Sequence, residues 1–263
     1  MIYVCIPSYN EAPTVGLLLW KVRQVFAGFP REYQLLVLDD GSTDSTAEVL
    51  EPYTRVLPLT IIRHPERRGY AASVEALLRR AVELTDRPKR DAAILMHADF
   101  AHNTQTIPDL VRRIESGADV VVAQAKLEGE PVRSQYWLRR YAPLLLRGVV
   151  TVPGVLDLVS GFAIIRLVAL RNAIRSQAGR LLVTDGWTAN AELYWRAARY
   201  ARRIEAVTSI ERHDLRRRPS RVRPWETAAH IWAFRRALRD SPVPPWAGEP
   251  SNRQEETQPE VVS

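Results

Sequence analysis

The sequence has little cysteine and no long uninterrupted apolar run. Its single cysteine, Cys5, excludes an internal disulfide. The longest apolar region, residues 142–170, is broken by Arg147, Asp157, Arg166 and two prolines. A helix that crosses a membrane needs about 20 consecutive apolar residues, so this region does not predict one.

The amino end also lacks the pattern of a secretory leader. Residues 1–6 are mostly apolar and are followed by Pro7, which is typical of a short strand and not of a basic segment before an apolar one. Together with the single cysteine, this pattern favours a reducing compartment. We therefore expect a cytoplasmic protein, with peripheral contact at the inner face of the membrane as a secondary expectation.

The composition is that of a folded, basic protein. Of its 263 residues, 46% are hydrophobic and 25% are charged, which suffices for a buried core and excludes a mostly disordered chain. The formal net charge is +7, and residues 196–240 alone carry 13 arginines against five acidic residues. This balance favours acidic partners such as phosphate groups, nucleotides, nucleic acids or an anionic membrane.

Short apolar runs alternate with amphipathic segments through the first half of the chain. Apolar residues at helical spacing behind Pro13 predict one helix, and further helix starts are indicated at 45–48 and 106–109. This alternation predicts an α/β fold, a single Rossmann-like domain whose mostly parallel central sheet is flanked by helices. The runs that predict strands are 3–6, 35–38, 59–62, 92–96 and 120–123.

The second half is less regular. Its pattern predicts strands at 160–166 and 203–210, and Pro, Glu, Gln and Ser dominate after residue 240. We therefore expect the folded domain to span residues 1–240, with a disordered tail over 241–263. Helices are predicted at 133–150, 188–200 and 225–238.

Polar residues follow each of the first four predicted strands. Ligands bind beyond the carboxyl ends of the strands in an open parallel sheet, so these residues are the candidates for a site. They are Pro-Ser-Tyr-Asn-Glu at 7–11, Asp-Asp-Gly-Ser-Thr-Asp at 39–44, Arg-His-Pro-Glu-Arg-Arg-Gly-Tyr at 63–70 and His-Ala-Asp at 97–99.

Asp39 and Asp40 are adjacent carboxylates that repel each other and need hydrogen-bond donors. The hydroxyl groups of a ribose or the N–H groups of a base would supply such donors. A turn held by Asp39 and a helix start at Asp44 explain the same residues equally well.

His97 and Asp99 lie two residues apart, on the same side of an extended segment. A carboxylate and an imidazole together suit Mn²⁺, whereas Mg²⁺ usually prefers oxygen ligands alone. Such an ion would neutralise a diphosphate leaving group. Taken alone, a hydrogen-bonded histidine at a strand end is the commoner arrangement.

The order of these motifs is similar to that of a known family. The chain resembles the family 2 glycosyltransferases of the GT-A nucleotide-sugar fold, particularly the branch of dolichol-phosphate mannose synthase and the bacterial polyprenyl-phosphate glycosyltransferases. The resemblance runs from Ile2 to about Arg223. Besides the motifs at 7–11 and 39–44, it rests on Arg68-Gly69-Tyr70-Ala71-Ala72, Asp157-Leu158-Val159-Ser160-Gly161-Phe162 and Ser220-Arg221.

The resemblance implies an activity and roles for individual residues. The activity is an inverting transfer of a sugar from a nucleotide-diphosphate sugar to an acceptor such as a polyprenyl phosphate, with Mn²⁺ or Mg²⁺ as cofactor. Residues 1–125 would form the nucleotide-sugar-binding half and residues 126–240 the acceptor-side half. The implied residues are Pro7, Tyr9, Glu11, Asp39, Asp40, Arg67, Arg68, Ala98 and Arg221 for the nucleotide, His97, Asp99 and His213 for the metal, and Arg139, Arg140 and Ser160 for the acceptor.

Asp157 is the candidate catalytic residue. If the acceptor is a hydroxyl group, the reaction needs a general base, and Asp157 would serve as that base. If the acceptor is a lipid phosphate, which is already anionic, no strong base is needed and Asp157 would orient groups. A turn or capping role before the strand at 160–166 is a nearly equal alternative.

The sequence departs from the family pattern at several positions. His97 replaces the first metal-binding carboxylate, and Ala101, Gln124 and Pro143 replace residues common in the synthases. One alternative is therefore a degenerate protein that binds nucleotide sugar or lipid with little turnover. A nucleic-acid-binding module built on the arginine-rich segment is a distant alternative, and no nucleic-acid partner is expected. Several tryptophans near arginines suit core packing, or peripheral membrane contact as a second reading.

Overall fold

A mostly parallel seven-stranded sheet forms the centre of the structure, a computed structural model that describes residues 1–128, 152–177, 179–212, 229, 232 and 236. The strand order is β3-β2-β1-β4-β6-β5-β7. Strand β6 is antiparallel to both of its neighbours, and the other pairings are parallel. The strands are β1 (Ile2–Ser8), β2 (Tyr33–Asp40), β3 (Leu59–His64), β4 (Ala92–Leu95), β5 (Val120–Glu128), β6 (Ala163–Arg166) and β7 (Ile204–Arg212).

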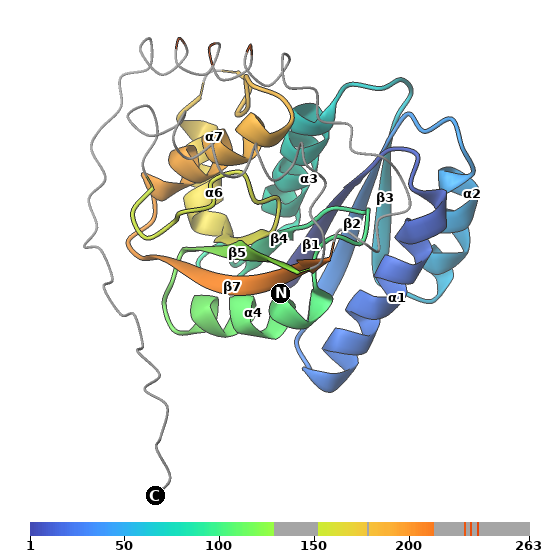
Figure 1. Cartoon of the computed structure of the whole chain (residues 1–263), viewed down its shortest axis with the longest axis horizontal. Helices are drawn as coiled ribbons and strands as arrows, with labels where there is room; N and C mark the ends of the chain where they lie inside the picture. Colours follow the sequence, from blue (N-terminus) through green and yellow to red (C-terminus); the bar gives the residue numbers. More distant parts are fainter. Residues whose placement is uncertain (129–151, 178, 213–228, 230–231, 233–235, 237–263) are drawn as a thin grey trace, which may run out of the picture.

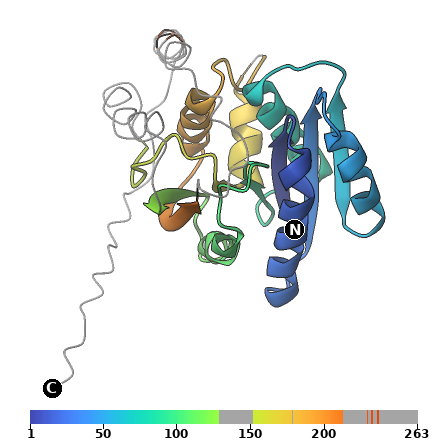
Figure 2. The same ribbon diagram turned by 45° about the vertical axis from the view of Figure 1, so that its right-hand side comes forward.

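Helices cover both faces of this sheet (Figure 1). On one face lie α3 (Tyr70–Leu84), α6 (Leu167–Arg175) and α7 (Trp187–Ala198), and on the other α1 (Ala12–Gly28) and α4 (Ile107–Glu115). In the turned view of Figure 2 the yellow and orange helices α6 and α7 stay together, apart from the blue α1. The short elements are α2 (Thr46–Leu50) and the 3₁₀ turns η1 (Glu51–Arg55) and η2 (Thr104–Thr106).

Two hydrophobic cores fill the spaces between the sheet and its helices. Side chains alternate along a strand, so Cys5 of β1 belongs to the core under α3 while Val4 and Ile6 belong to the core under α1. Both faces are therefore buried. This explains why the strands of the first half are continuous apolar runs instead of alternating ones.

The structure confirms the fold class that the sequence predicted. Each predicted strand is present, and α1, α2 and α4 begin next to the predicted starts. The helices expected at 133–150 and, but for three residues, 225–238 lie outside the described residues, as does the tail at 241–263. The limits of the domain and of its two halves stay predictions. Within the described ranges, no helix has the length and apolarity required to traverse a bilayer.

Two local details differ from the sequence-based expectation. The strand expected at 160–166 begins only at Ala163, because Asp157 Oδ1 accepts the N–H groups of Val159 and Ser160 and so forms a turn ahead of it. At the start of α2, the side chain of Ser45 makes no capping bond. The neighbouring Asp44 carboxylate accepts the Thr46 N–H (3.0 Å) in its place.

A buried ion pair fixes the end of the antiparallel strand β6. Arg166 donates from Nε to Asp119 (2.8 Å) and from its other two nitrogens to three backbone carbonyls. Asp119 also accepts the backbone N–H of Arg202 (2.8 Å), and only 4% of its side chain is exposed. The pair therefore joins β6 to the start of β5 and to the turn that precedes β7.

Replacing Arg166 with methionine should lower the free energy of unfolding by about 3 kcal/mol, because the buried Asp119 would lose its buried positively charged partner and keep only the Arg202 N–H and an exposed arginine side chain. Urea denaturation followed by circular dichroism measures the change. Arg112→Met is the matched control, since the Arg112–Asp109 pair lies exposed on α4 and contributes less than about 1 kcal/mol. Equal losses in the two variants would contradict the role given to Arg166.

Candidate active site

The two adjacent aspartates at the end of β2 face opposite sides of the sheet. Asp40 is in step with Leu38, which packs under α3, and Asp39 is in step with Val37, which packs under α1. Both side chains are buried, at 4% exposed each. Alternation therefore separates the two carboxylates and gives each its own set of donors.

Asp40 holds the turn that begins α3. Its Oδ1 accepts the N–H of Arg68 (2.9 Å) and its Oδ2 accepts the N–H of Gly69 (2.9 Å). His64, its register partner on β3, donates from Nδ1 to Oδ1 (2.7 Å). Gly69 has a φ of +94°, a backbone conformation that glycine adopts without steric cost. The carboxylate of Asp40 is thus occupied by the protein itself.

Asp39 has fewer protein partners than Asp40. Its Oδ1 accepts the N–H of Ser42 (3.1 Å), which closes the turn after β2. Among the residues that the structure describes, no donor reaches its Oδ2 within hydrogen-bond distance. Asp39 can therefore both hold this turn and accept a hydrogen bond from a ligand.

The loop after β1 is joined to the loop after β2. The Asn10 N–H donates to Ser42 Oγ (2.9 Å), and the Thr43 N–H donates to Asn10 Oδ1 (2.8 Å). Asn10 has a φ of +53°, in the left-handed region that asparagine tolerates better than most residues. The Glu11 N–H donates to Thr46 Oγ1 (2.9 Å). The motifs at 7–11 and 39–44 therefore form one continuous surface.

Arg67 brings the third motif to the same place. Its guanidinium carbon lies 4.4 Å from the centre of the Tyr9 ring, which is a cation–π contact. Glu11 follows Tyr9 and is 4% exposed, and its Oε2 accepts the hydroxyl of Thr14 (3.1 Å). An aromatic ring, a cation and a buried carboxylate thus come together where β1, β2 and β3 end.

A directed chain of hydrogen bonds leads to His97. Asn190 donates from Nδ2 to the carbonyl of Val159 (3.2 Å), so its Oδ1 is the acceptor for the Tyr70 hydroxyl (2.8 Å). Tyr70 has a single proton and gives it to Asn190, so the contact of its oxygen with His97 Nε2 (3.0 Å) needs a proton on Nε2. Neutral His97 therefore carries its lone pair on Nδ1.

The chemical environment keeps that tyrosine protonated. Burial raises the pKa of Tyr70 well above its usual value, and the nearby charges of Asp99 and Asp185 raise it further. Gly161 lies against the same histidine: a Cβ at position 161 would be 2.1 Å from His97 Nε2. A glycine here is what lets the imidazole approach Tyr70.

His97 and Asp99 are the two described residues that the sequence predicts as ligands of a divalent metal. Asp99 is 2% exposed, and its Oδ1 accepts the Ala101 N–H (3.2 Å). Within the described part of the chain no cluster of three or more His, Cys, Asp or Glu could hold an ion. An imidazole nitrogen and a carboxylate fit Mn²⁺ if oxygens of a diphosphate complete its shell. His213, the third predicted ligand, lies outside the described residues.

The predicted acceptor-side residues are only partly described. Ser160 is fully buried, and its hydroxyl donates to the carbonyl of Ala123 (2.7 Å). Asp157 accepts two backbone N–H groups of the turn that ends at Ser160. The roles predicted for both residues stay predictions. The positively charged candidates Arg139, Arg140 and Arg221 lie outside the described residues.

A family comparison agrees with the motifs. The model of the family described as "Glycosyl transferase family 2" matches residues 3–173. The chain belongs to glycosyltransferase family 2. The match contains the strand-end motifs and the turn at 157–160, and it confirms the resemblance found in the sequence.

The glycosyltransferase has curated relatives in archaea and bacteria. It is 26% identical over 168 residues to a dolichol-phosphate mannosyltransferase of Pyrococcus furiosus, covering 62% of this chain and 45% of the relative. It is 28% identical over 150 residues to an undecaprenyl-phosphate 4-deoxy-4-formamido-L-arabinose transferase of Proteus mirabilis, covering 56% and 42%. The chain thus spans less than half the length of either relative.

Solved structures share the fold of this glycosyltransferase. A mannosyltransferase of Pyrobaculum calidifontis in complex with GDP-Man and Mn²⁺ superposes with a TM-score of 0.59 at 21% identity, covering 93% of this chain and 66% of that one. Glucosyl-3-phosphoglycerate synthase of Mycobacterium tuberculosis, in complex with Mn²⁺, UDP and glucosyl-3-phosphoglycerate, gives 0.53 at 20%, covering 90% and 77%. At such identities the likeness carries the fold alone, and it confirms the predicted GT-A fold.

Sequence analysis gave no individual role to several residues that contact the predicted site residues. His64 is one, although its position at the end of β3, level with Asp40 on β2, is a signal that strand register could have given. Tyr70 and Asn190 are two more, and they are 120 residues apart. Asp185, which contacts the start of α3, is the fourth. No local pattern in the sequence links these last three.

Tyr70→Phe should release His97 from a single tautomer. Without the phenol oxygen, Nε2–H loses its acceptor, and the Nδ1–H form becomes populated. Long-range ¹H–¹⁵N spectra of histidine-labelled protein, assigned with His97→Gln, distinguish the two forms. Tyr33→Phe, at the opposite end of β2, is the control and should leave the spectrum unchanged. An Nδ1–H signal for His97 in the unsubstituted protein would contradict the hydrogen-bond chain.

Proposed function

We propose that this chain is an inverting glycosyltransferase that moves a sugar from a nucleotide-diphosphate sugar to a polyprenyl phosphate. Membership of family 2 supports the reaction, and the names of the relatives support the acceptor class. The observation that carries the proposal is the convergence of four strand ends. Asp40 contacts His64, Arg67 contacts Tyr9, and Tyr70 contacts His97.

The donor nucleotide would lie over the ends of β1, β2 and β3. The flat ring of Tyr9 is a surface for a base, and Asp39 Oδ2 accepts an N–H or O–H of the base or ribose. Arg67 and Arg68 belong to the loop whose backbone is bound by the buried Asp40, and they supply positive charge for the diphosphate. The remaining proposed contacts come from Pro7, Glu11, Ala98 and Arg221.

A divalent metal would be held by His97 and Asp99. Mn²⁺ suits this pair, and Mg²⁺ is the second choice. When bound, the ion supplies positive charge against the diphosphate that leaves the sugar. Neighbouring residues orient the two proposed metal ligands. Tyr70 and Asn190 set the tautomer of His97, and the Ala101 N–H orients Asp99.

Inversion requires the acceptor oxygen to attack the anomeric carbon opposite the departing diphosphate. Holding both reactants in line lowers the barrier, and positive charge stabilises the leaving group. Arg139, Arg140 and Ser160 are the proposed acceptor residues. A lipid phosphate is already anionic, so Asp157 would orient groups, whereas a hydroxyl acceptor would need it as a base. This acceptor would bring the protein into peripheral contact with a membrane.

Asp39→Asn should weaken nucleoside-diphosphate binding by about tenfold or more, because a charged acceptor for the nucleotide is replaced by a neutral amide. Isothermal titration with UDP, GDP and dTDP measures the affinity. Asp40→Asn is the matched variant: it should instead lower the melting temperature of the free protein, since Asp40 holds the turn at 68–69. If Asp39→Asn binds as tightly as the unsubstituted protein, the role given to Asp39 is wrong.

The reaction itself is tested by transfer of radiolabelled sugar from UDP-glucose, UDP-GlcNAc or GDP-mannose into undecaprenyl phosphate, with Mn²⁺ present. We expect a labelled lipid product, lost in Asp99→Ala. Binding of a nucleotide sugar without product would favour the degenerate, binding-only alternative. Steeply salt-dependent binding of DNA, with no nucleotide binding, would favour the nucleic-acid alternative.

A further inference from the structure

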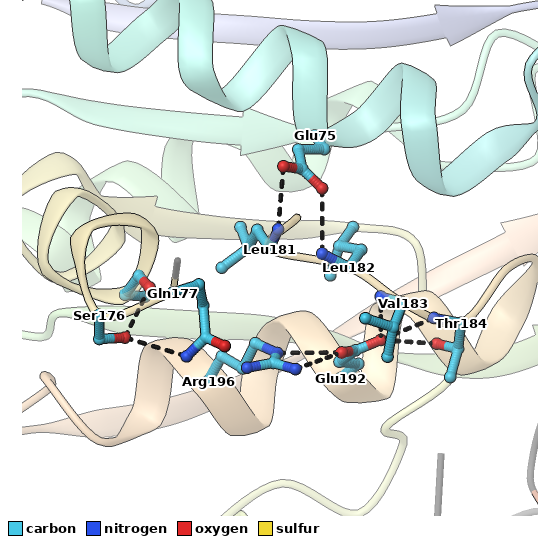
Figure 3. A network of polar contacts seen from close by, with 10 residues as sticks. Glu75, Ser176, Gln177, Leu181, Leu182, Val183, Thr184, Glu192 and Arg196 are labelled. Carbon is cyan, nitrogen blue, oxygen red and sulfur yellow. Dashed lines mark hydrogen bonds and ion pairs between the residues drawn. The ribbon is translucent and has the colours of Figure 1, made fainter. Parts of the chain in front are cut away.

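The segment at residues 181–184 has no helix or strand, yet each of its N–H groups is accepted by a buried carboxylate (Figure 3). Glu75 of α3 accepts the N–H groups of Leu181 (2.9 Å) and Leu182 (3.0 Å). Glu192 of α7 accepts those of Val183 and Thr184 (3.0 Å each) and the Thr184 hydroxyl (2.8 Å). The segment is thereby fixed between two helices.

Arginines on the same helices balance the two carboxylates. Arg79 donates to Glu75 (2.8 Å) and Arg196 donates twice to Glu192 (2.9 and 2.7 Å). Glu192 is 0% exposed and Glu75 8%. Buried ionised groups with this many donors are rigid, so the residue that follows the segment has a defined position.

That residue is Asp185, and it reaches the first turn of α3. Its Oδ1 accepts the Ala71 N–H (2.8 Å). Its Oδ2 lies against Gly69, 2.6 Å from where a Cβ would be. Within the described part of the chain, no hydrogen-bond donor reaches Oδ2. One oxygen of Asp185 therefore holds the helix, and the other faces the turn at 68–70.

This turn lies between the two parts of the proposed donor site. Its N–H groups at 68 and 69 bind Asp40, on the nucleotide side. Its Tyr70 hydroxyl contacts His97, on the metal side. The effect of the Asp185 charge on the pKa of Tyr70 agrees with this closeness. In the proposed donor site, Asp185 Oδ2 thus lies against the turn that separates the nucleotide side from the metal side.

We propose that Asp185 binds the sugar of the donor, by accepting a hydrogen bond from a sugar hydroxyl at Oδ2. A diphosphate offers only anionic acceptors, which a carboxylate repels, whereas sugar hydroxyls are the donors that the substrate presents here. Asp185 is then a residue that distinguishes a nucleotide sugar from the free nucleotide. The inference rests on the proposed function, because it needs the nucleotide to bind at the ends of β1 to β4.

The inference is tested by titrating Asp185→Asn with a nucleoside diphosphate and with the corresponding nucleotide sugar. The ligand pairs are UDP with UDP-glucose and GDP with GDP-mannose. Asparagine keeps Oδ1 for Ala71 and replaces Oδ2 with an NH₂ group, so the helix start is retained. We expect the Kd of the free nucleotide to change less than twofold and the Kd of the nucleotide sugar to rise at least fivefold. Asp185→Ser, whose hydroxyl can also accept from Ala71, is the second variant.

Asp86→Asn controls for the loss of one negative charge, since this side chain is 88% exposed and lies beyond the far end of α3. It should leave both affinities unchanged. An equal loss for nucleotide and nucleotide sugar in Asp185→Asn, or no loss for either, overturns the inference while the proposed function stands. If the unsubstituted protein binds neither nucleotide nor nucleotide sugar, the proposed function itself fails, and this inference with it.

Discussion

Buried carboxylates that accept backbone N–H groups hold the loops of this site in place. The site lies beyond the strand ends, where the backbone no longer has a sheet ladder to bind its N–H groups. Asp40 takes over that task for the turn at 68–69. Its partner His64 adds a third donor, so the charge of Asp40 is compensated although the side chain is buried. The first turn of α3 therefore has a fixed position relative to β2.

The same interaction fixes the other side of that helix. Glu75 and Glu192 together hold the 181–184 segment, and each uses one oxygen for an arginine of its own helix. A chain without regular structure usually moves more than the helices it joins. Here four consecutive N–H groups are bound by two buried carboxylates, which fixes the backbone of the segment. Asp40 and Asp185 then accept N–H groups from the same turn and the start of α3.

The sheet could be predicted from the sequence because its signal is local. Buried parallel strands are short apolar runs, and polar residues directly after them mark the edge where a site forms. This reasoning selected Tyr9, Asp39, Asp40, Arg67 and His97 as candidates for the site. It could not assign separate roles to Asp39 and Asp40. The backbone N–H groups that bind these carboxylates belong to turns, and the conformation of those turns is set only in the folded protein.

The contacts that orient His97 were beyond prediction for a different reason. Tyr70 is the first residue of α3, and Asn190 lies within α7. Only the packing of α3 against α7 and the 159–161 turn brings the two side chains together. Glu192 is a further case: an acidic residue in a helical pattern is usually solvated, yet this one is 0% exposed. Its role depends on a segment eight residues earlier that has no pattern of its own.

The hydrogen-bond donors and acceptors around position 97 explain why a histidine fits there. The Tyr70 hydroxyl has one proton, and Asn190 takes it because its own NH₂ group is committed to Val159. A residue that contacts the Tyr70 oxygen must therefore be a donor. An ionised carboxylate at 97 could only accept, and the contact would place two acceptors around one proton. A neutral imidazole donates from Nε2 to the Tyr70 oxygen. It also avoids a third negative charge near a phenol that already lies close to Asp99 and Asp185. Within this arrangement a histidine at position 97 keeps the contact with Tyr70 that an ionised carboxylate could not make.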